Sequence, residues 1–374
     1  MLEYLPLKKV NAPYEEAIQA AMRRVVESGW YLFGQEVAAF EADWATYCGV
    51  PQEGGCVACA NGLDALRMVL RAWVVMGKVQ PGDEVIVPAN TYIASILAVS
   101  DAGLKPVPVE PNPHTYLIDP ENVERAITPR TKIILPVHLY GQICPMEALM
   151  DIAHRHHLLV LEDCAQCHGV APHYQGDAQA WSFYPGKNLG ALGDAGAVTS
   201  ADSELLQVVR QLGFYGSQRK YVHDYKGLNS RMDEVQAAVL RVKIPDLDHA
   251  NRRRQEIAQR YLAEVKHSDL VLPTQEQNHV WHIFPVLTTH RDDLQRYLLD
   301  QGVQTQIHYP IPPHRQKAYS EWSALSFPIT ERIAAQELSL PCHPAMTDAE
   351  VTTVIEMLNA YNAKPKECIN CKRS

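Results

Sequence analysis

The sequence predicts an α/β fold, with a large domain on a mostly parallel sheet followed by a small α+β domain. From residue 82 to residue 170, short apolar segments alternate with amphipathic ones, which is typical of βαβ units around a buried sheet. The chain has 374 residues, too many for one ordinary core, and its composition changes near residue 248. We therefore expect four parts: an N-terminal arm at 1–13, a large domain at 14–247, a small domain at 248–364 and a flexible tail at 365–374.

Composition limits the partners that this chain can have. Apolar residues make up 47% and charged residues 21% of the chain, as in globular proteins. The net charge is −9 and there is no basic block, so nucleic acid is not an expected partner. The longest apolar runs, such as residues 93–99, are too short to span a bilayer, and the N-terminus lacks the pattern of a signal peptide. We expect a cytoplasmic protein with no membrane partner.

The helices follow from apolar residues that recur at helical spacing. Pro6 and Pro13 discourage helix in the arm, which is therefore expected to be extended. The segment 30–34 is unusually apolar for a surface connection and should pack into a cleft or against a partner. Helices are expected at 14–28, 35–47, 93–102, 120–127, 146–157, 204–212, 232–242 and 247–265, and a further long helix opens at residue 61.

Short apolar runs predict the strands. In the large domain they are expected at 56–60, 84–87, 106–109, 132–137, 158–161 and 195–199, and in the aromatic run that begins at residue 181. The small domain is expected to contain strands at 279–288 and 303–307, a proline-rich turn at 309–313, and helices at 292–301 and 351–361. The polar segment 214–229 has no periodicity and is expected to be a long functional loop. The arginine run at 252–254 is most simply a solvated helix face.

One lysine stands out because of its local sequence. Lys187 follows an apolar, aromatic run that Pro185 and Gly186 interrupt, which predicts a strand and then a turn. The backbone of such a turn can hold a lysine whose amine faces a pocket, as an imine-forming lysine requires. The alternative interpretation is an ordinary surface lysine.

Polar residues follow three of the predicted parallel strands, at 90–92, 138–142 and 162–169. Ligands bind at this end of such sheets. Asp163 lies near the end of one strand, 24 residues before Lys187, where its carboxylate could pair with a protonated pyridine nitrogen. Gly62 opens a helix whose free N–H groups favour an anion such as phosphate. The alternatives are a helix cap for Asp163 and an ordinary helix start capped by Asn61.

The chain has nine cysteines, six of them in three Cys-x-x-Cys pairs. Paired cysteines of this kind can build a zinc site. Buried free thiols in a reducing cytosol are the simpler interpretation, so we expect no metal. A zinc-dependent redox protein remains an alternative. The pairs are Cys56/Cys59, Cys164/Cys167 and Cys368/Cys371.

Four motifs occur in one order along the chain, and together they resemble those of the pyridoxal 5'-phosphate (PLP)-dependent sugar-nucleotide aminotransferases of the DegT/StrS family. The resemblance covers residues 4–361, and its motifs lie at 61–66, 162–169, 183–190 and 229–238. It implies the fold type I of PLP-dependent transferases, as in aspartate aminotransferase. It also implies a homodimer whose subunits share their active sites.

The resemblance assigns a role to each matching residue. Lys187 would hold PLP as an imine and later move the proton between substrate and cofactor. The other expected cofactor contacts are the Gly62 and Leu63 amides and the Ser182 hydroxyl for the phosphate, Asp163 for the pyridine nitrogen, Gln166 for the ring hydroxyl, Tyr92 stacked on the ring, and Asn229 for the phosphate in the other subunit's site. Many members have threonine where this chain has Leu63, so here the phosphate would rely on backbone groups.

Four segments, at 60–66, 88–94, 137–142 and 307–314, carry a finer resemblance. It is to enzymes that use L-glutamate to aminate carbon 3 of a dTDP-linked 3-keto-6-deoxyhexose. His308 and Tyr309 would contact the sugar or its diphosphate, unless they only form a rigid turn. Tyr31, Tyr184 and the loop 219–225 are further candidate contacts to the nucleotide-linked ketosugar. Amination at carbon 4 and a UDP-linked 3-keto sugar remain alternatives, as does a sugar-nucleotide binding protein without catalysis.

Overall fold

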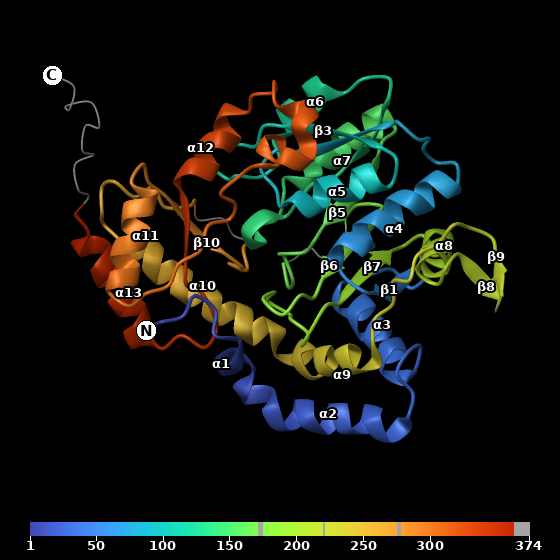
Figure 1. The fold of residues 1–374 in the computed structure, drawn as a ribbon, viewed down its shortest axis with the longest axis horizontal. Helices are drawn as coiled ribbons and strands as arrows, with labels where there is room; N and C mark the ends of the chain where they lie inside the picture. The colour runs from blue at the N-terminus through green and yellow to red at the C-terminus, as the bar shows by residue number, and fades with distance from the viewer. Residues whose placement is uncertain (171–174, 220, 275–277, 363–374) are drawn as a thin grey trace.

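The computed structural model describes residues 1–170, 175–219, 221–274 and 278–362 (Figure 1). The tail expected at 365–374, with its Cys368/Cys371 pair, lies outside the described residues. Among the residues that are described, no helix is long and apolar enough to cross a membrane.

A seven-stranded sheet forms the centre of the molecule (Figure 1). Its strands run in the spatial order β1-β7-β6-β5-β4-β2-β3. The pairs that β7 forms with β1 and β6 are antiparallel, and the other neighbouring pairs are parallel. This confirms the mostly parallel sheet. The strands are β1 (Gly55–Cys59), β2 (Glu84–Pro88), β3 (Lys105–Val109), β4 (Thr131–Ile134), β5 (Leu159–Asp163), β6 (Ala178–Ser182) and β7 (Gly196–Ser200).

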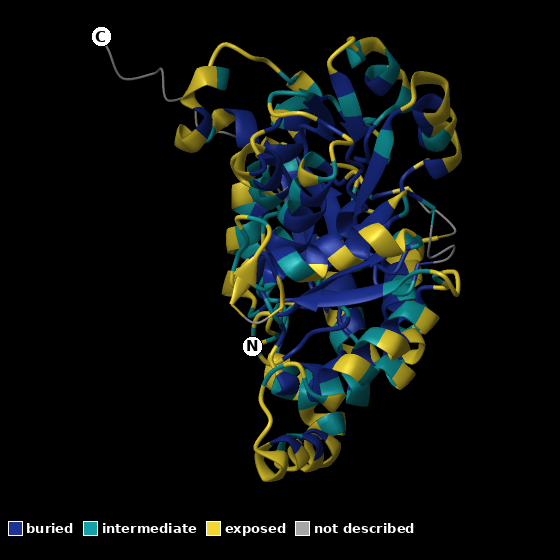
Figure 2. Ribbon diagram, turned by 90° about the vertical axis from the view of Figure 1, so that its right-hand side faces the viewer, coloured by how far each residue is buried: buried dark blue, intermediate teal, exposed yellow. Residues whose placement is uncertain are grey.

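Helices cover both faces of this sheet, as the sequence predicts. Alternate residues of β1 join two different buried clusters, because successive side chains of a strand point to opposite faces. Helices α4, α5, α7 and α8 contribute to one cluster, and α3 and α9 to the other. The helices are α3 (Gln35–Tyr47), α4 (Gly62–Val75), α5 (Ile93–Asp101), α6 (Pro120–Ala126), α7 (Met146–His156), α8 (Ser203–Gly213) and α9 (Glu234–Lys243). Figure 2 shows the buried residues concentrated in these layers.

A third buried cluster lies in the C-terminal part, around a two-stranded antiparallel sheet. Its elements are α10 (Leu247–Glu264), β10 (Phe284–Leu287), α11 (Arg291–Asp300), β11 (Glu337–Leu340) and α13 (Asp348–Ala360). Tyr319 and Ile333 instead belong to the main cluster of the large sheet, so the chain returns to that domain before β11. The domain boundary near 248 stays a prediction.

Three expectations for the small domain were wrong or incomplete. The strand expected at 303–307 is not formed, and only Val303 and Gln306 make isolated bridges. The strand expected at 279–288 is reduced to β10. Helix α12 (Pro328–Gln336) and strand β11 were missed, because the polar residues Glu337 and Ser339 argue against a buried strand.

The N-terminal arm is not fully extended, contrary to the expectation. Pro6 directly precedes α1 (Leu7–Asn11), and the turn Ala12–Tyr14 leads into α2 (Glu15–Ser28). Proline is tolerated at the start of a helix, so neither Pro6 nor Pro13 prevents these short turns. The arm starts beside the small domain, where Leu2 bridges Val303, and ends at α2 along the lower edge of the molecule (Figures 1 and 2).

Two further segments differ in detail from the sequence analysis. The long loop at 214–229 contains a small hairpin, β8 (Ser217–Arg219) and β9 (Val222–His223), which projects at the right of Figure 1. Within the arginine run, Arg254 is buried rather than solvated. Its guanidinium donates hydrogen bonds to the backbone carbonyls of Trp281 and Cys342.

Candidate active site

The turn that carries Lys187 is held at several points. The Lys187 N–H donates to the Tyr184 carbonyl at 2.8 Å, which closes the turn after β6. A side chain at Gly190 would clash with the Pro185 carbonyl. The close approach of the backbone at these two residues therefore requires glycine at position 190. The ammonium of the buried Lys243 donates to the Gly190 carbonyl at 2.6 Å. The position of Lys187 is thus set by the scaffold.

The side chain of the next residue, Asn188, ties this turn to the C-terminal part. Its amide donates to Asn251 Oδ1 at 2.8 Å and to the Val280 carbonyl at 3.2 Å. Its oxygen lies 3.0 Å from Nδ1 of His282. Since the oxygen of an amide only accepts, Nδ1 of His282 must carry the proton. No role for Asn188 could be predicted from its position after Lys187, because its partners are distant in the sequence.

Asp163 ends β5 and is buried. One carboxylate oxygen accepts from the Ser95 hydroxyl at 2.8 Å, and the other accepts from the Ala165 N–H at 3.1 Å. Burial raises the pKa of Asp163, and these hydrogen bonds and the nearby Lys187 cation oppose that rise. Burial also lowers the pKa of Lys187 to about 8, against the influence of Asp163. Each of the two groups therefore influences the pKa of the other.

The start of α4 lies against the end of β6. A Cβ atom at Gly62 would lie 2.6 Å from Ser182 Cβ, and one at Gly196 would clash with the Asn61 backbone. Asn61 caps the helix and accepts a backbone N–H at 2.9 Å, so the capping interpretation is confirmed. The first N–H groups of a helix, here those of Gly62 and Leu63, have no partner within the helix. Together with the Ser182 hydroxyl they form a cradle that fits a phosphate.

Enlarging this glycine should weaken cofactor binding. We expect Gly62→Ala to lower the affinity for PLP about tenfold or more, because the new methyl group must displace Ser182 or the helix start. Titration of the apoprotein with PLP measures this. Gly55→Ala is the matched control, because its Cβ would meet only Leu206, at an ordinary 3.6 Å. An unchanged affinity in Gly62→Ala would place the phosphate elsewhere.

Two tyrosines and a glutamine form one wall of the site. The rings of Tyr92 and Tyr309 lie 5.1 Å apart, although they come from distant parts of the chain. The Gln166 amide donates to the Tyr309 hydroxyl at 3.0 Å, and its oxygen accepts from the Tyr140 N–H at 2.6 Å. The half-exposed face of Tyr92 is free to cover a planar ring. These contacts join three of the residues that the sequence analysis selected.

His308 lies beside this wall. Its backbone carbonyl accepts from the Tyr140 hydroxyl at 2.6 Å, and its Nδ1 lies 2.7 Å from the Ser339 hydroxyl. Burial and the Lys187 cation lower the pKa of His308 to about 4, so the imidazole is neutral near pH 7. Neutral imidazole has one donor and one acceptor nitrogen. His308 can therefore contact substrate without adding a charge.

Tyr31 and Asn229 belong to a different region of the surface, and Tyr184 is exposed directly before the Lys187 turn. The Tyr31 carbonyl accepts from the Glu234 N–H at 3.0 Å, and Asn229 bridges Phe214. Phe33 contacts Phe214 edge-on, and the Arg231 guanidinium lies over both rings at 5.7 Å. We call this region the aromatic patch; it consists of Trp30, Tyr31, Phe33, Phe214, Tyr215, Asn229 and Arg231.

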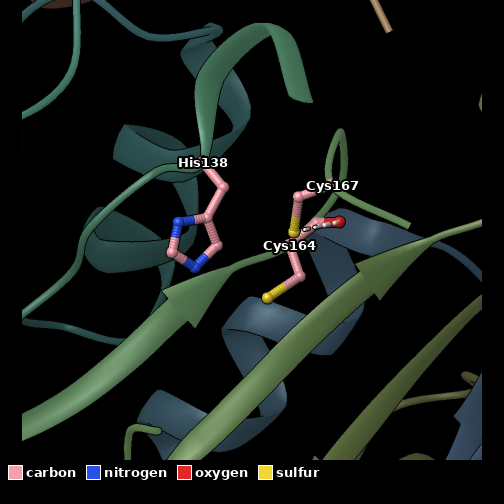
Figure 3. A group of neighbouring side chains, drawn as sticks. All are labelled: His138, Cys164 and Cys167. Carbon is pink, nitrogen blue, oxygen red and sulfur yellow. Dashed lines mark hydrogen bonds between the residues drawn. The ribbon is translucent and has the colours of Figure 1, made fainter. Parts of the chain in front are cut away.

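One cluster resembles a metal site in composition. The potential ligand atoms of His138, Cys164 and Cys167 lie within 4.8 Å of one another, with the Cys164 thiol directed toward the His138 ring (Figure 3). Both ring nitrogens are already engaged: Nε2 with Glu162 at 2.8 Å and Nδ1 with the Cys144 N–H at 3.1 Å. Burial raises the pKa of the Cys164 thiol, which opposes the thiolate that a metal needs. The hydrogen bonds account for the cluster without an ion.

The fold and the site define an enzyme that transfers an amino group with the help of PLP. The chain belongs to the DegT/DnrJ/EryC1/StrS aminotransferase family, whose model matches residues 13–359. This confirms the family predicted from the four motifs.

Curated relatives and solved structures agree with this assignment. The chain is 51% identical to dTDP-3-amino-3,6-dideoxy-alpha-D-galactopyranose transaminase of Aneurinibacillus thermoaerophilus, over 96% of this chain and 99% of the relative. The structure of S. venezuelae DesV in complex with a ketimine intermediate matches with a TM-score of 0.90 and 44% identity, over 95% of this chain and 96% of the other. The structure of NtdA from Bacillus subtilis with bound PMP matches with a TM-score of 0.89 and 34% identity, over 95% and 83%.

Proposed function

We propose that this protein moves the amino group of L-glutamate to carbon 3 of a dTDP-linked 3-keto-6-deoxyhexose, giving a dTDP-3-amino-3,6-dideoxyhexose. The observation that carries this proposal is the convergence of Lys187, Asp163 and the α4 phosphate cradle at one end of the sheet. The likeness to the relative from Aneurinibacillus thermoaerophilus supports the sugar nucleotide. The presence of Lys187, Asp163 and Gln166 argues against a binding protein without catalysis, because binding alone would not require these residues.

Lys187 and Asp163 would have different roles in the reaction. PLP, when bound, supplies a ring that withdraws electrons from the substrate carbon. Lys187 would hold the cofactor covalently and then carry the proton to and from that carbon as general base and acid. Its lowered pKa, about 8, leaves more free amine at neutral pH than an ordinary lysine has. Asp163 would keep the ring nitrogen protonated.

The remaining contacts position the two ligands. The Gly62 and Leu63 amides, the Ser182 hydroxyl and Asn229 of the second copy would hold the phosphate. Tyr92 would cover the ring and Gln166 would bind its hydroxyl group. We propose Tyr31, Tyr184, His308 and Tyr309 as contacts to the nucleotide-linked sugar, because their side chains border the site or the aromatic patch.

A panel of ketosugars tests the substrate. We expect the enzyme with glutamate to aminate a dTDP-linked 3-keto-6-deoxyhexose in preference to its 4-keto isomer and to a UDP-linked 3-keto sugar, with products identified by mass and NMR spectroscopy. Faster turnover of either competitor would replace the proposed substrate with the corresponding alternative.

We also propose a homodimer with shared sites. Trp30 is 62% exposed and Phe33 48%, and such a group of large apolar side chains marks an interaction surface. A second copy that covers the aromatic patch would bring Asn229 to its neighbour's site.

Mixing two variants, one in each of the proposed shared residues, tests the shared site. In a mixed dimer of Lys187→Ala and Asn229→Ala subunits, one site combines an intact Lys187 with an intact Asn229. We therefore expect each mixed dimer to have about half of the wild-type activity. The two variants are refolded together, and the activity of the dimer fraction is measured. If the mixture only averages the two variants, Asn229 serves its own subunit's site.

We propose a cytoplasmic location and no resident metal. The seven described cysteines are free and buried, which suits a reducing compartment. Stoichiometric zinc in the purified protein would contradict the absence of a metal site and restore the redox alternative.

A further inference from the structure

One nitrogen of the neutral His308 ring, Nδ1, is engaged with the small domain, and Nε2 has no hydrogen-bond partner among the described residues. Nδ1 lies 2.7 Å from the Ser339 hydroxyl. Because the ring is neutral, a proton on Nδ1 makes Nε2 an acceptor, whereas a proton on Nε2 makes it a donor. The direction of the Ser339 hydroxyl therefore decides what Nε2 offers to a ligand.

Ser339 has a second strong partner on the same strand. Its Oγ lies 2.5 Å from Oε1 of Glu337, two residues earlier in β11 and thus on the same face. The other carboxyl oxygen of Glu337 accepts from the His308 N–H at 2.6 Å. The carboxyl group, the hydroxyl and the histidine thus form a closed loop of hydrogen bonds. Tyr4 lies close to Ser339, and its hydroxyl can donate to the Ser339 oxygen in either state, since a hydroxyl accepts twice.

The single proton of the hydroxyl couples the two ends of this loop. When Glu337 is ionised, Ser339 donates to it and must accept from Nδ1–H of His308, so Nε2 presents a lone pair. When Glu337 is protonated, its O–H donates to Ser339, which then donates to Nδ1 of His308. In that state Nε2 carries the proton and is a donor.

The surroundings of Glu337 favour its protonated form. The side chain is fully buried, and burial raises its pKa to about 8, although Ser339, the His308 N–H and the Arg291 cation oppose the rise. Arg291 of α11 donates to the backbone carbonyl of Glu337 at 3.3 Å and also pairs with Asp292. The other titratable groups facing Glu337 are phenols whose pKa burial raises, so they stay neutral; they are Tyr4, Tyr116, Tyr140 and Tyr309.

We propose that Glu337, acting through Ser339, is a positioning residue that sets the hydrogen-bonding role of His308 Nε2 toward the nucleotide-linked ketosugar. This inference rests on the proposed function, because it needs His308 to face that substrate. Phosphate and carbonyl oxygens of the substrate only accept hydrogen bonds, so a donor at Nε2 favours binding and a lone pair opposes it. Protonated Glu337 supplies the donor.

The Michaelis constant tests this coupling in the holoenzyme. As pH rises through about 8, the KM of the wild type for the ketosugar should rise about tenfold, because one hydrogen bond to a charged acceptor is lost. Glu337→Gln should have a KM that stays flat, since the amide donates to Ser339 at every pH. Ser339→Ala, which cuts the link, should also lose the step near pH 8. Lys187, whose pKa is also about 8, is the same in all three enzymes, so only the part of the step that is lost in both variants is assigned to Glu337. A step of equal size in Glu337→Gln would overturn the proposal.

A second measurement uses the wild-type protein without substrate. The nitrogen chemical shifts of His308 in ¹⁵N-histidine-labelled holoenzyme report which ring nitrogen carries the proton. We expect the proton to move from Nε2 to Nδ1 as pH passes about 8, and a tautomer that stays constant would overturn the coupling. If the tautomer changes but the dTDP-linked ketosugar is not turned over, the coupling stands and the proposed substrate fails.

Discussion

Replacing Lys187 by alanine is expected to slow the glutamate half-reaction about 10²–10⁴-fold through the loss of proton transfer alone. The loss of the covalent anchor adds to this effect. Because the turn is held by Asn188, Gly190 and Lys243, the variant should keep its fold. Single-turnover absorbance after mixing with L-glutamate measures the rate.

Lys187→Arg is the matched control for this prediction. Arginine keeps the positive charge beside Asp163 but does not supply a free amine near neutral pH. We therefore expect Lys187→Arg to be as slow as Lys187→Ala. Activity close to that of the wild type in either variant would show that the reaction does not need this amine.

The second large effect is expected at Asp163. Asp163→Asn should reduce kcat about 10²–10³-fold, because the site loses the buried charge placed to stabilise a cationic ring. The variant should also lower the pKa of Lys187 below about 8, since Asp163 is the charge that raises it. The pH profile of PLP binding to the apoprotein measures that shift, and steady-state kinetics measures kcat.

Ser95→Ala separates the charge of Asp163 from its hydrogen bonds. It removes one bond of 2.8 Å and leaves the carboxylate in place. Because the carboxylate keeps its bond from the Ala165 N–H, we expect about a tenfold loss of kcat, the lower end of what a hydrogen bond to a charged group contributes. If Ser95→Ala and Asp163→Asn lose the same activity, the geometry of the carboxylate matters and its charge does not.

The site residues at the ends of the strands could be predicted from the sequence, because the residues next to them determine the local structure. The aromatic run followed by Pro185 and Gly186 indicated a strand and a turn, and β6 and the Lys187 turn confirm this. Gly62 after Asn61 indicated a helix start that a ligand can approach. Such signals lie within a few residues of the site, so no knowledge of distant contacts is needed.

The rest depends on contacts between distant parts of the chain. Nothing near Arg254 distinguishes it from its two exposed or half-exposed neighbours, and only the carbonyls of Trp281 and Cys342 make its burial favourable. From the sequence, Glu337 is likewise expected to be a surface carboxylate. Its burial follows from the pairing of β11 with β10, and its carboxyl group then accepts from the His308 N–H. Sequence periodicity carries no information on either partner.

The absorption spectrum of the purified protein, before and after L-glutamate, tests the central claim most directly. PLP held by Lys187 should absorb in the visible range, and transfer of the glutamate amino group should move the band into the near ultraviolet. We expect the wild type to show this shift and Lys187→Ala to lack the starting band. A wild type that stays colourless with added PLP would show that Lys187 is not the anchor, and the chain would then be a sugar-nucleotide binding protein on an aminotransferase fold.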